Sequence, residues 1–406
     1  MRSLGVLGRA IALIAATAIF GTVISTAQAA TTYKIGVDLP MSGADASNGI
    51  PTNNGVVLAV EEANAKGLPG GITLQVQTLD DAVQGVHDPA AGAQNIKTFV
   101  ADATVMGVVG PFNSNVARAE IPASNDAGLV QISPSNTNDG LTIGESAKAL
   151  RTSHPDTIAY FRVCTRDQNQ GRAGAALAKS LGFKKVYIID DNETYGKGLA
   201  DVFDAAWVAG GGTVLGHDHL TKNQQDFKAL LTKVKATNPD AVYFGGVTAT
   251  GGGLLRKQMS DVGLSSTPYI GGDGISDEEF KKIAGTMANN SYYTVAAPDT
   301  SKLASAQAFN KAYLAKFKSA PGPYSASAYA AAQVIIAAIV AANKSGAVTR
   351  AAVRTNVAGT KDQATPIGSI GFDKNGDVLN GVISSYKINN GKDEFISQTA
   401  IKSSAG

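Results

Sequence analysis

Cysteine, tryptophan and net charge are all scarce in this chain of 406 residues. Cys164 is the single cysteine, which excludes an internal disulfide. Its place in the apolar run 160–164 predicts a buried core residue rather than a reactive thiol. Lysine and arginine number 35 against 33 acidic residues. The chain therefore has no basic field that would attract nucleic acid or an anionic membrane.

Motifs for common catalytic and cofactor chemistry are also absent. There is no G-x-x-x-x-G-K-[ST] phosphate loop, no H-E-x-x-H and no G-x-S-x-G elbow. His217 and His219 are possible metal ligands, but no third histidine or cysteine lies nearby in the sequence, so a solvated loop is favoured. Asp373-x-Asn375-x-Asp377 lacks the glycine and closing glutamate of a calcium loop and is interpreted as a hairpin turn. We therefore expect no enzyme, no cofactor and no bound metal.

The first 29 residues have the order of a secretory signal peptide. Arg2 and Arg9 are their only charges, an apolar stretch runs over 10–24, and Ala27-Gln28-Ala29 is a small-x-small cleavage site. The stretch is shorter than the ~20 residues that span a bilayer. With no cysteine near the cut to carry a lipid, we predict cleavage near Ala29 and a soluble periplasmic protein.

Strand-like and helix-like runs alternate along the rest of the chain, which is too long for one ordinary core. This rhythm occurs twice and predicts an α/β protein with two doubly wound lobes, each a parallel sheet with helices on both faces. Strands are expected at 34–39, 72–79, 105–109, 129–132, 186–190, 213–215, 241–244 and 268–270, and helices at 53–65, 90–100, 121–127, 198–209, 226–236, 254–262 and 325–342. Near the end, 370–372 and 382–388 are expected to be two strands joined by a turn.

Polar and hydroxyl residues follow several expected strands directly. Asn113 and Ser114 follow strand 105–109, and Ser135 and Thr137 follow strand 129–132. Hydroxyls and backbone N–H groups at a helix N-terminus suit an anion such as a carboxylate. Ordinary helix capping by Ser114 and Thr137 explains them equally well.

The second half repeats this arrangement. Tyr195 follows strand 186–190, and Asp273 follows strand 268–270. A carboxylate at such a sheet edge can face an ammonium group, since ligands of doubly wound sheets bind outside the carboxyl ends of the strands. The alternative role for Asp273 is to cap a helix that begins near Ser276.

Taken together and in order, these segments resemble the branched-chain amino-acid-binding proteins of ABC importers. The similar segments cover nearly the whole chain after the signal peptide: Lys34-Ile35-Gly36-Val37, Pro40-Met41-Ser42-Gly43, 55–64, Val109-Gly110-Pro111, Ile132-Ser133-Pro134, Tyr160-Phe161-Arg162, 194–198 and 238–243. The resemblance implies a type I periplasmic binding protein, whose two lobes are joined by a three-stranded hinge. It divides this chain into a signal peptide over 1–29, a first lobe over 30–157 with 297–364, and a second lobe over 158–296 with 365–406.

The same resemblance implies which residues bind the ligand. Ser114, with Ser135 and Thr137, would hold a carboxylate. Tyr195 matches the tyrosine of the family's Y-G motif, and Asp273 would face the α-ammonium group. Asn48 stands near a position where many members have an aromatic residue, and Val247 and Thr248 replace a second one. The full predicted set is Asn48, Asn113, Ser114, Ser135, Thr137, Tyr195, Val247, Thr248 and Asp273.

The resemblance also implies a function and its partners. We expect a monomer that binds an amino acid or a related small polar molecule and delivers it to the membrane permease of an ABC transporter, without nucleic acid. The alternative is a sensor subunit that binds the ligand and signals through a separate membrane partner.

Overall fold

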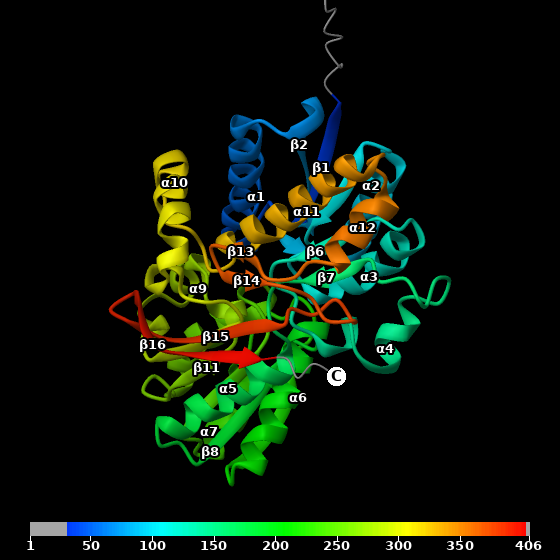
Figure 1. Ribbon diagram of the computed structural model, residues 1–406. Helices are drawn as coiled ribbons and strands as arrows, with labels where there is room; N and C mark the ends of the chain where they lie inside the picture. Colours follow the sequence, from blue (N-terminus) through cyan, green and yellow to red (C-terminus); the bar gives the residue numbers. More distant parts are fainter. Residues whose placement is uncertain (1–30, 403–406) are drawn as a thin grey trace, which may run out of the picture.

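A computed structural model describes residues 31–402 as two α/β lobes (Figure 1). The predicted signal peptide lies outside the described residues. One described helix, α11 (Ser325–Ser345), is long and apolar enough to span a membrane, but 78% of its most apolar window is buried inside the protein. It packs against α1 (Ala46–Lys66) and is a core helix of the first lobe.

The first lobe is built on a five-stranded parallel sheet in the order β2-β1-β5-β6-β7. Its central strand β5 is buried along its whole length, as expected for a parallel strand covered on both faces. Its strands are β1 (Thr32–Leu39), β2 (Thr73–Asp80), β5 (Val105–Val109), β6 (Gln131–Ser133) and β7 (Tyr160–Arg162), and a short hairpin, β3 (Ala82–Val83) and β4 (Val86–His87), follows β2; the helices around this sheet include α1, α2 (Pro89–Ala101), α3 (Ser114–Asp126), α4 (Gly144–Ala149), α10 (Gln307–Phe317), α11 and α12 (Arg350–Ala358).

The second lobe is built on a seven-stranded sheet in the order β16-β15-β12-β11-β10-β8-β9. The five strands β8 to β12 run parallel, and β15 and β16 add an antiparallel ribbon at one edge of the sheet. The strands are β8 (Lys185–Asp190), β9 (Thr213–His219), β10 (Ala241–Gly245), β11 (Tyr269–Gly271), β12 (Ser291–Val295), β15 (Asn380–Asn389) and β16 (Lys392–Lys402), and the helices are α5 (Asp167–Ser180), α6 (Thr194–Ala209), α7 (Lys228–Ala236), α8 (Gly253–Gln258) and α9 (Glu278–Ala284).

The parallel strands of both sheets have the same doubly wound order, in which the second strand lies outside the first and the later strands follow on the other side. The winding direction therefore reverses between β1 and β5 in the first lobe and between β8 and β10 in the second. Ligands of such sheets bind at the carboxyl ends of the strands beside this reversal. The fold thus confirms the predicted class of two doubly wound α/β lobes.

The chain passes between the lobes three times: from β7 to α5, from β12 to α10, and from α12 to β15. The predicted lobe division differs from the sheets at β7. Strand β7 was assigned to the second lobe, but it pairs with β6 in the first sheet. Because the hydrogen bonds of a strand fix its place in a sheet, we propose that the first passage begins after Arg162.

Two local predictions are wrong. The expected hairpin between 370–372 and 382–388 does not form, because β15 pairs with β12 and β16, and a single bridge from Phe372 to Val378 closes the turn instead. His217 and His219 lie in strand β9 rather than in a solvated loop. Cys164, by contrast, is buried and free, as predicted.

Candidate functional site between the lobes

Direct contacts between the two lobes bring their strand ends together. Helices α3 and α6 pack against each other. The amide Nδ2 of Asn138, from the first lobe, donates to the Thr194 carbonyl at 2.7 Å, and the amide of Asn115 donates to the Glu193 carboxylate at 3.0 Å. The structure is therefore a closed arrangement of the two lobes.

Asp273 occupies the second lobe's side of this contact. It begins a short turn (Asp273–Ile275) after β11, and only 6% of it is exposed. Its Oδ1 accepts hydrogen bonds from the Gln170 amide and, at 3.0 Å, from the Tyr195 hydroxyl. A Cβ on Gly272 would lie 2.3 Å from the Tyr195 hydroxyl oxygen, so glycine at this position leaves room for Tyr195 to reach the carboxylate.

The Asp273 carboxylate has hydrogen-bond donors but no cationic side chain within ion-pair distance among residues 31–402. Burial raises the pKa of Asp273 above its usual value of 3.8, while the hydrogen bonds from Gln170 and Tyr195 act in the opposite direction. A buried carboxylate in this state gains most from a cation that enters with a ligand.

Ser114 and Thr137 occupy the first lobe's side. Ser114 is the first residue of α3, and its hydroxyl accepts a weak 3.4 Å hydrogen bond from the Asn138 backbone N–H. The Asn113 Oδ1 is buried without a hydrogen-bond partner in the described chain, and the buried Thr137 hydroxyl lies beside the Asp167 carboxylate. Asn113 does not cap α3 with its side chain, so the N-terminus of this helix keeps N–H groups available for an anion.

Helix α5 connects these two sides. The backbone N–H of Asp167, at its first turn, donates to the Thr137 carbonyl at 2.7 Å. Gln170, one turn later on the same helix, donates to Asp273. The structure thus brings Ser114, Thr137, Tyr195 and Asp273 into one connected region, which we call the inner site.

Ser135 is near the inner site but its hydroxyl is already used. It donates to the Phe112 carbonyl at 2.9 Å, and the Asn136 amide donates to the same oxygen at 2.7 Å. These bonds tie the turn after β6 to the turn after β5. A shaping role therefore fits the Ser135 hydroxyl better than direct contact with a ligand.

Asn48 and Thr248 meet around Asp277 rather than around Asp273. The Thr248 hydroxyl donates to Asp277 Oδ2 at 2.7 Å, and the Asn48 amide lies 3.5 Å from the same oxygen. The Val247 side chain packs over Gly274, the residue after Asp273, because a Cβ on Gly274 would lie 2.9 Å from Val247 Cγ1. The predicted set therefore divides into the inner site and a contact between α1 and the turn after β10.

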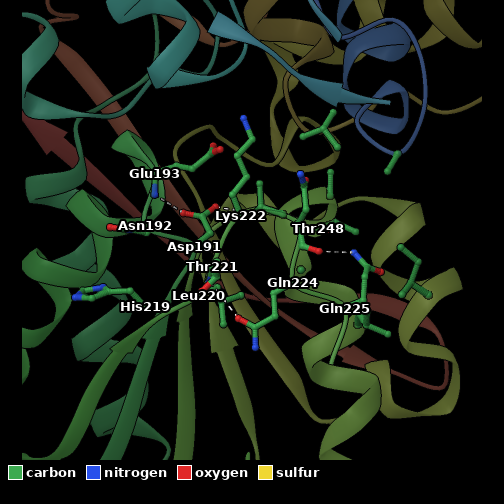
Figure 2. Close-up of a pocket in the computed structure, with 18 of the residues that line it drawn as sticks. Asp191, Asn192, Glu193, His219, Leu220, Thr221, Lys222, Gln224, Gln225 and Thr248 are labelled. Carbon is green, nitrogen blue, oxygen red and sulfur yellow. Dashed lines mark hydrogen bonds between the residues drawn. The ribbon is translucent and has the colours of Figure 1, made fainter. Parts of the chain in front are cut away.

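A cavity of about 880 Å³ lies at an edge of the lobe contact, and Figure 2 shows its lining. Most of this lining comes from the second lobe, around Asp191 and Lys222, and a smaller part comes from the first lobe at Ala44, Gln84 and Val86. Thr248 is the one member of the predicted set that lines it. We call it the rim cavity, because Ser114, Thr137, Tyr195 and Asp273 are not among its lining residues.

Gln170 and Tyr324 belong to the inner site but were not predicted. Gln170 lies inside helix α5, and Tyr324 lies directly before α11. Neither residue follows the end of a strand, which was the pattern used to predict the site. The Tyr324 ring packs edge-on against Phe112 at 5.6 Å, and its hydroxyl lies beside Asp273. The inner site thus contains aromatic side chains from both lobes. The predicted set included Tyr195 but neither Phe112 nor Tyr324.

His87 forms a latch between the lobes. Its Nδ1 lies 2.7 Å from Asp45 Oδ2 in the first lobe, and its Nε2 lies 2.7 Å from Glu193 Oε2 in the second. Carboxylates only accept hydrogen bonds, so a His87 that donates from both nitrogens is an imidazolium. Burial alone would lower the pKa of His87, but hydrogen bonds and charge from Asp45 and Glu193 outweigh it and raise the pKa well above 6.5.

The latch predicts that ligand affinity decreases at alkaline pH. When the lobes open, Glu193 moves away from His87, so the pKa of His87 is higher in the closed form than in the open form. The latch is therefore fully formed when the pH is below the pKa of the open form. It is lost as the pH rises through the pKa of the closed form. We expect affinity to decrease between about tenfold and 150-fold across that range above neutral pH, since a hydrogen bond between charged groups contributes about 1.5–3 kcal/mol. Titration calorimetry from pH 6 to pH 10 measures this. The buried carboxylates of Asp81 and Asp191 also face His87, so His87→Gln is the necessary control; an equal decrease in that variant would contradict the latch.

The two doubly wound lobes and the three passages between them define a type I periplasmic binding fold. The family profile described as "Periplasmic binding protein" matches residues 32–393, and the chain belongs to this family. Its members are non-enzymatic solute-binding proteins that act outside the cytoplasm.

Relatives and solved structures agree with this assignment. The chain is 35% identical to the Leu/Ile/Val-binding protein BraC3 of Rhizobium johnstonii, over 88% of this chain and 92% of that protein. It is 32% identical to the Leu/Ile/Val-binding protein homolog 3 of Brucella melitensis, over 94% and 98%. The structure is similar to that of the branched-chain amino acid transporter substrate binding protein LivJ from Streptococcus pneumoniae in complex with isoleucine, with a TM-score of 0.79, 30% identity, and coverage of 92% of this chain and 100% of that chain.

Proposed function

We propose that this protein is the solute-binding component of an ABC importer and binds an amino acid in the inner site. This proposal rests mainly on complementary groups that lie on opposite sides of the lobe contact. On the second lobe, the buried carboxylate of Asp273 lacks a cation in the described chain; on the first lobe, the Ser114 and Thr137 hydroxyls lie by the N-terminus of α3. A molecule with an ammonium and a carboxylate group would satisfy both lobes at once.

The relatives support an α-amino acid with an apolar side chain. Two relatives are named as Leu/Ile/Val-binding proteins, and the LivJ structure contains isoleucine. In this chain, Phe112, Tyr324 and Val247 supply apolar surface near Asp273. Burial of a leucine or isoleucine side chain against such surface contributes about 1.5–3 kcal/mol.

Closure explains how binding would be communicated to a permease. A ligand that contacts both lobes stabilises the closed form relative to the open one, so the population shifts toward closure. The closed form presents both lobes in one fixed relation, which a membrane partner can recognise. Cleavage of a signal peptide near Ala29 and action as a monomer belong to the same proposal.

A thermal-shift panel tests the ligand class directly. Protein freed of ligand by unfolding and refolding is heated with leucine, isoleucine, valine, other amino acids, amides and aromatic acids. A ligand at one hundred times its Kd should add about 2.7 kcal/mol of stability, which gives a shift of several degrees. We expect the branched-chain amino acids to give the largest shifts. If no amino acid gives a shift, the proposal is contradicted. If aromatic acids alone give a shift, the ligand is an aromatic acid and not an amino acid.

A further inference from the structure

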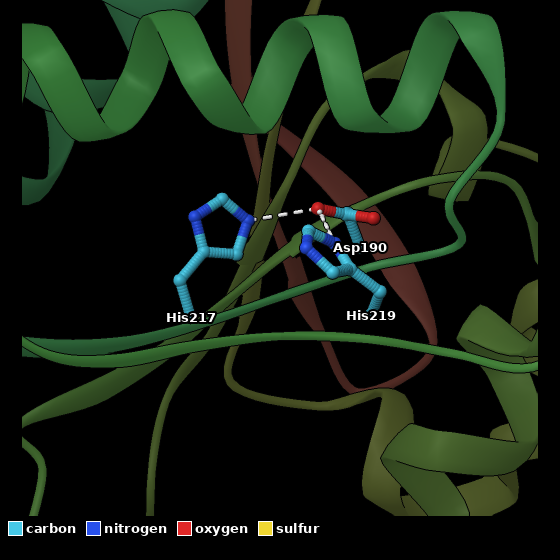
Figure 3. A group of neighbouring side chains, drawn as sticks. All are labelled: Asp190, His217 and His219. Carbon is cyan, nitrogen blue, oxygen red and sulfur yellow. Dashed lines mark hydrogen bonds and ion pairs between the residues drawn. The ribbon is translucent and has the colours of Figure 1, made fainter.

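The cluster Asp190, His217 and His219 lies in the second lobe, on the neighbouring strands β8 and β9 (Figure 3). Strand β9 lies at the edge of its sheet, and residues two apart on a strand point to the same face, which places both imidazoles together. Asp190, at the end of β8, pairs in register with His219. Asp190 could not be recognised as the third group from the sequence, because it lies 27 residues before His217.

The three side chains converge on one point. Asp190 Oδ2 lies 2.8 Å from His217 Nε2 and 2.8 Å from His219 Nδ1, and the three atoms lie within 4.8 Å of one another. Zn²⁺ binds nitrogen and oxygen at about 2.0–2.2 Å in tetrahedral geometry, which requires ligand atoms about 3.3 Å apart. The two pairs that include Asp190 Oδ2 need to open by only about 0.5 Å to reach this spacing, and the two imidazole nitrogens already lie within 4.8 Å of each other. His219 is about half exposed, so it is free to move by that amount.

Outer hydrogen bonds hold the ligand atoms in place. His217 Nδ1 lies 3.4 Å from Asp204 Oδ2 on α6, which directs Nε2 toward Asp190. The other oxygen of Asp190 accepts the backbone N–H of Asn192 at 2.8 Å, which fixes the carboxylate. A histidine held by a carboxylate through its second nitrogen is the usual support of a metal ligand.

An ion can reach the cluster from solvent. Asp190 is fully buried, but His219 also lines the rim cavity. Three protein ligands would leave one tetrahedral position open toward this cavity for water. Without metal, two imidazole N–H groups share the Asp190 oxygen, and a divalent ion would take the place of those two protons.

We propose that Asp190, His217 and His219 bind a divalent transition-metal ion of the zinc class, with His217 oriented by Asp204. Two imidazoles and one carboxylate suit Zn²⁺, and also Ni²⁺ or Cu²⁺, better than Ca²⁺ or Mg²⁺. All three ligands lie on β8 and β9, so the ion fastens the edge strand of the second lobe to its neighbour. The site requires neither lobe closure nor the proposed amino acid.

Metal titration of the full mature chain, without a histidine tag, tests the proposal. We expect Zn²⁺ to bind with 1:1 stoichiometry by calorimetry and to raise the melting temperature, and Co²⁺ to give tetrahedral absorption bands. Asp204→Asn should weaken Zn²⁺ binding about 10–100-fold, as loss of an outer partner usually does, and His217→Gln and His219→Gln, which each remove a direct ligand, should weaken it more than Asp204→Asn does.

His154→Gln is the matched control, because His154 is exposed and lies in a loop of the other lobe. It should leave Zn²⁺ affinity unchanged, and amino-acid binding should be unchanged in all of these variants. Two outcomes would overturn the site: Zn²⁺ that does not bind at millimolar concentration, or binding that survives both His217→Gln and His219→Gln. Mg²⁺ binding as tightly as Zn²⁺ would overturn the proposed ion class.

Discussion

Asp273→Asn should abolish detectable ligand binding while leaving the protein folded. The substitution keeps the shape of the side chain and an oxygen that accepts from Gln170 and Tyr195, but it removes the charge that would pair with the ammonium group. Loss of one partner of a buried charge pair costs about 2–5 kcal/mol, which is an affinity loss between about thirty-fold and several thousand-fold. Titration calorimetry with the best ligand of the thermal-shift panel measures this loss.

We expect the same substitution to increase the stability of the ligand-free protein, although it decreases affinity for the ligand. Burial raises the pKa of Asp273 above its usual value, so the ionised form is less favourable in the folded chain than in the unfolded chain. At neutral pH this difference lowers stability, and Asp273→Asn should raise the melting temperature of the ligand-free protein. Asp261→Asn, at an exposed position of the same lobe, is the control and should change neither property. Unchanged affinity in Asp273→Asn would remove Asp273 from the site.

Asp377→Ala should cause a large loss of stability. The Arg162 guanidinium is fully buried, and its Nε lies 2.6 Å from Asp377 Oδ1. Arg162 also donates to the carbonyls of Asn136 and Asn138, and Thr142 donates to both Asp377 oxygens at 3.0 Å. Removal of one partner from a buried ion pair costs about 3–5 kcal/mol, because the other charge stays buried without compensation.

Urea unfolding of the ligand-free protein measures the effect of Asp377→Ala. Asp201→Ala is a matched control, because Asp201 forms a 2.6 Å ion pair with Lys197 on the exposed surface of α6. An exposed pair of this kind contributes about 0–1 kcal/mol. A loss below about 1 kcal/mol for Asp377→Ala would contradict this prediction, because the buried pair would then contribute no more than an exposed one.

The order of strands and helices could be predicted because parallel strands buried on both faces are continuous apolar runs. Val105–Val109 and 186–190 are such runs, and β5 matches the prediction while β8 begins one residue earlier. Helix ends were harder. Helix α3 begins at Ser114 rather than at 121, because its first turn is polar where it faces the inner site.

The sequence also identified Ser114, Thr137, Tyr195 and Asp273 as candidates, because each follows the carboxyl end of a strand. The structure brings these four together and moves Asn48 and Thr248 to a separate contact around Asp277. Which strand ends face each other depends on the strand order of each sheet and on how the lobes close. Neither the strand order nor the closure of the lobes can be predicted from a local sequence pattern.

What the sequence by itself determined is the repeated α/β rhythm and the residues that stand at strand ends, since both follow from the local periodicity of apolar side chains. The tertiary structure alone decided the partners of buried charged groups. Asp377 meets Arg162 across 215 residues, and Asp190 meets His217 across 27. A buried charge is stable only with a partner, but the chain can supply that partner from any segment that folding brings near. The turn with Asp373 and Asp377 and the pair His217 and His219 therefore showed their roles only in the folded protein.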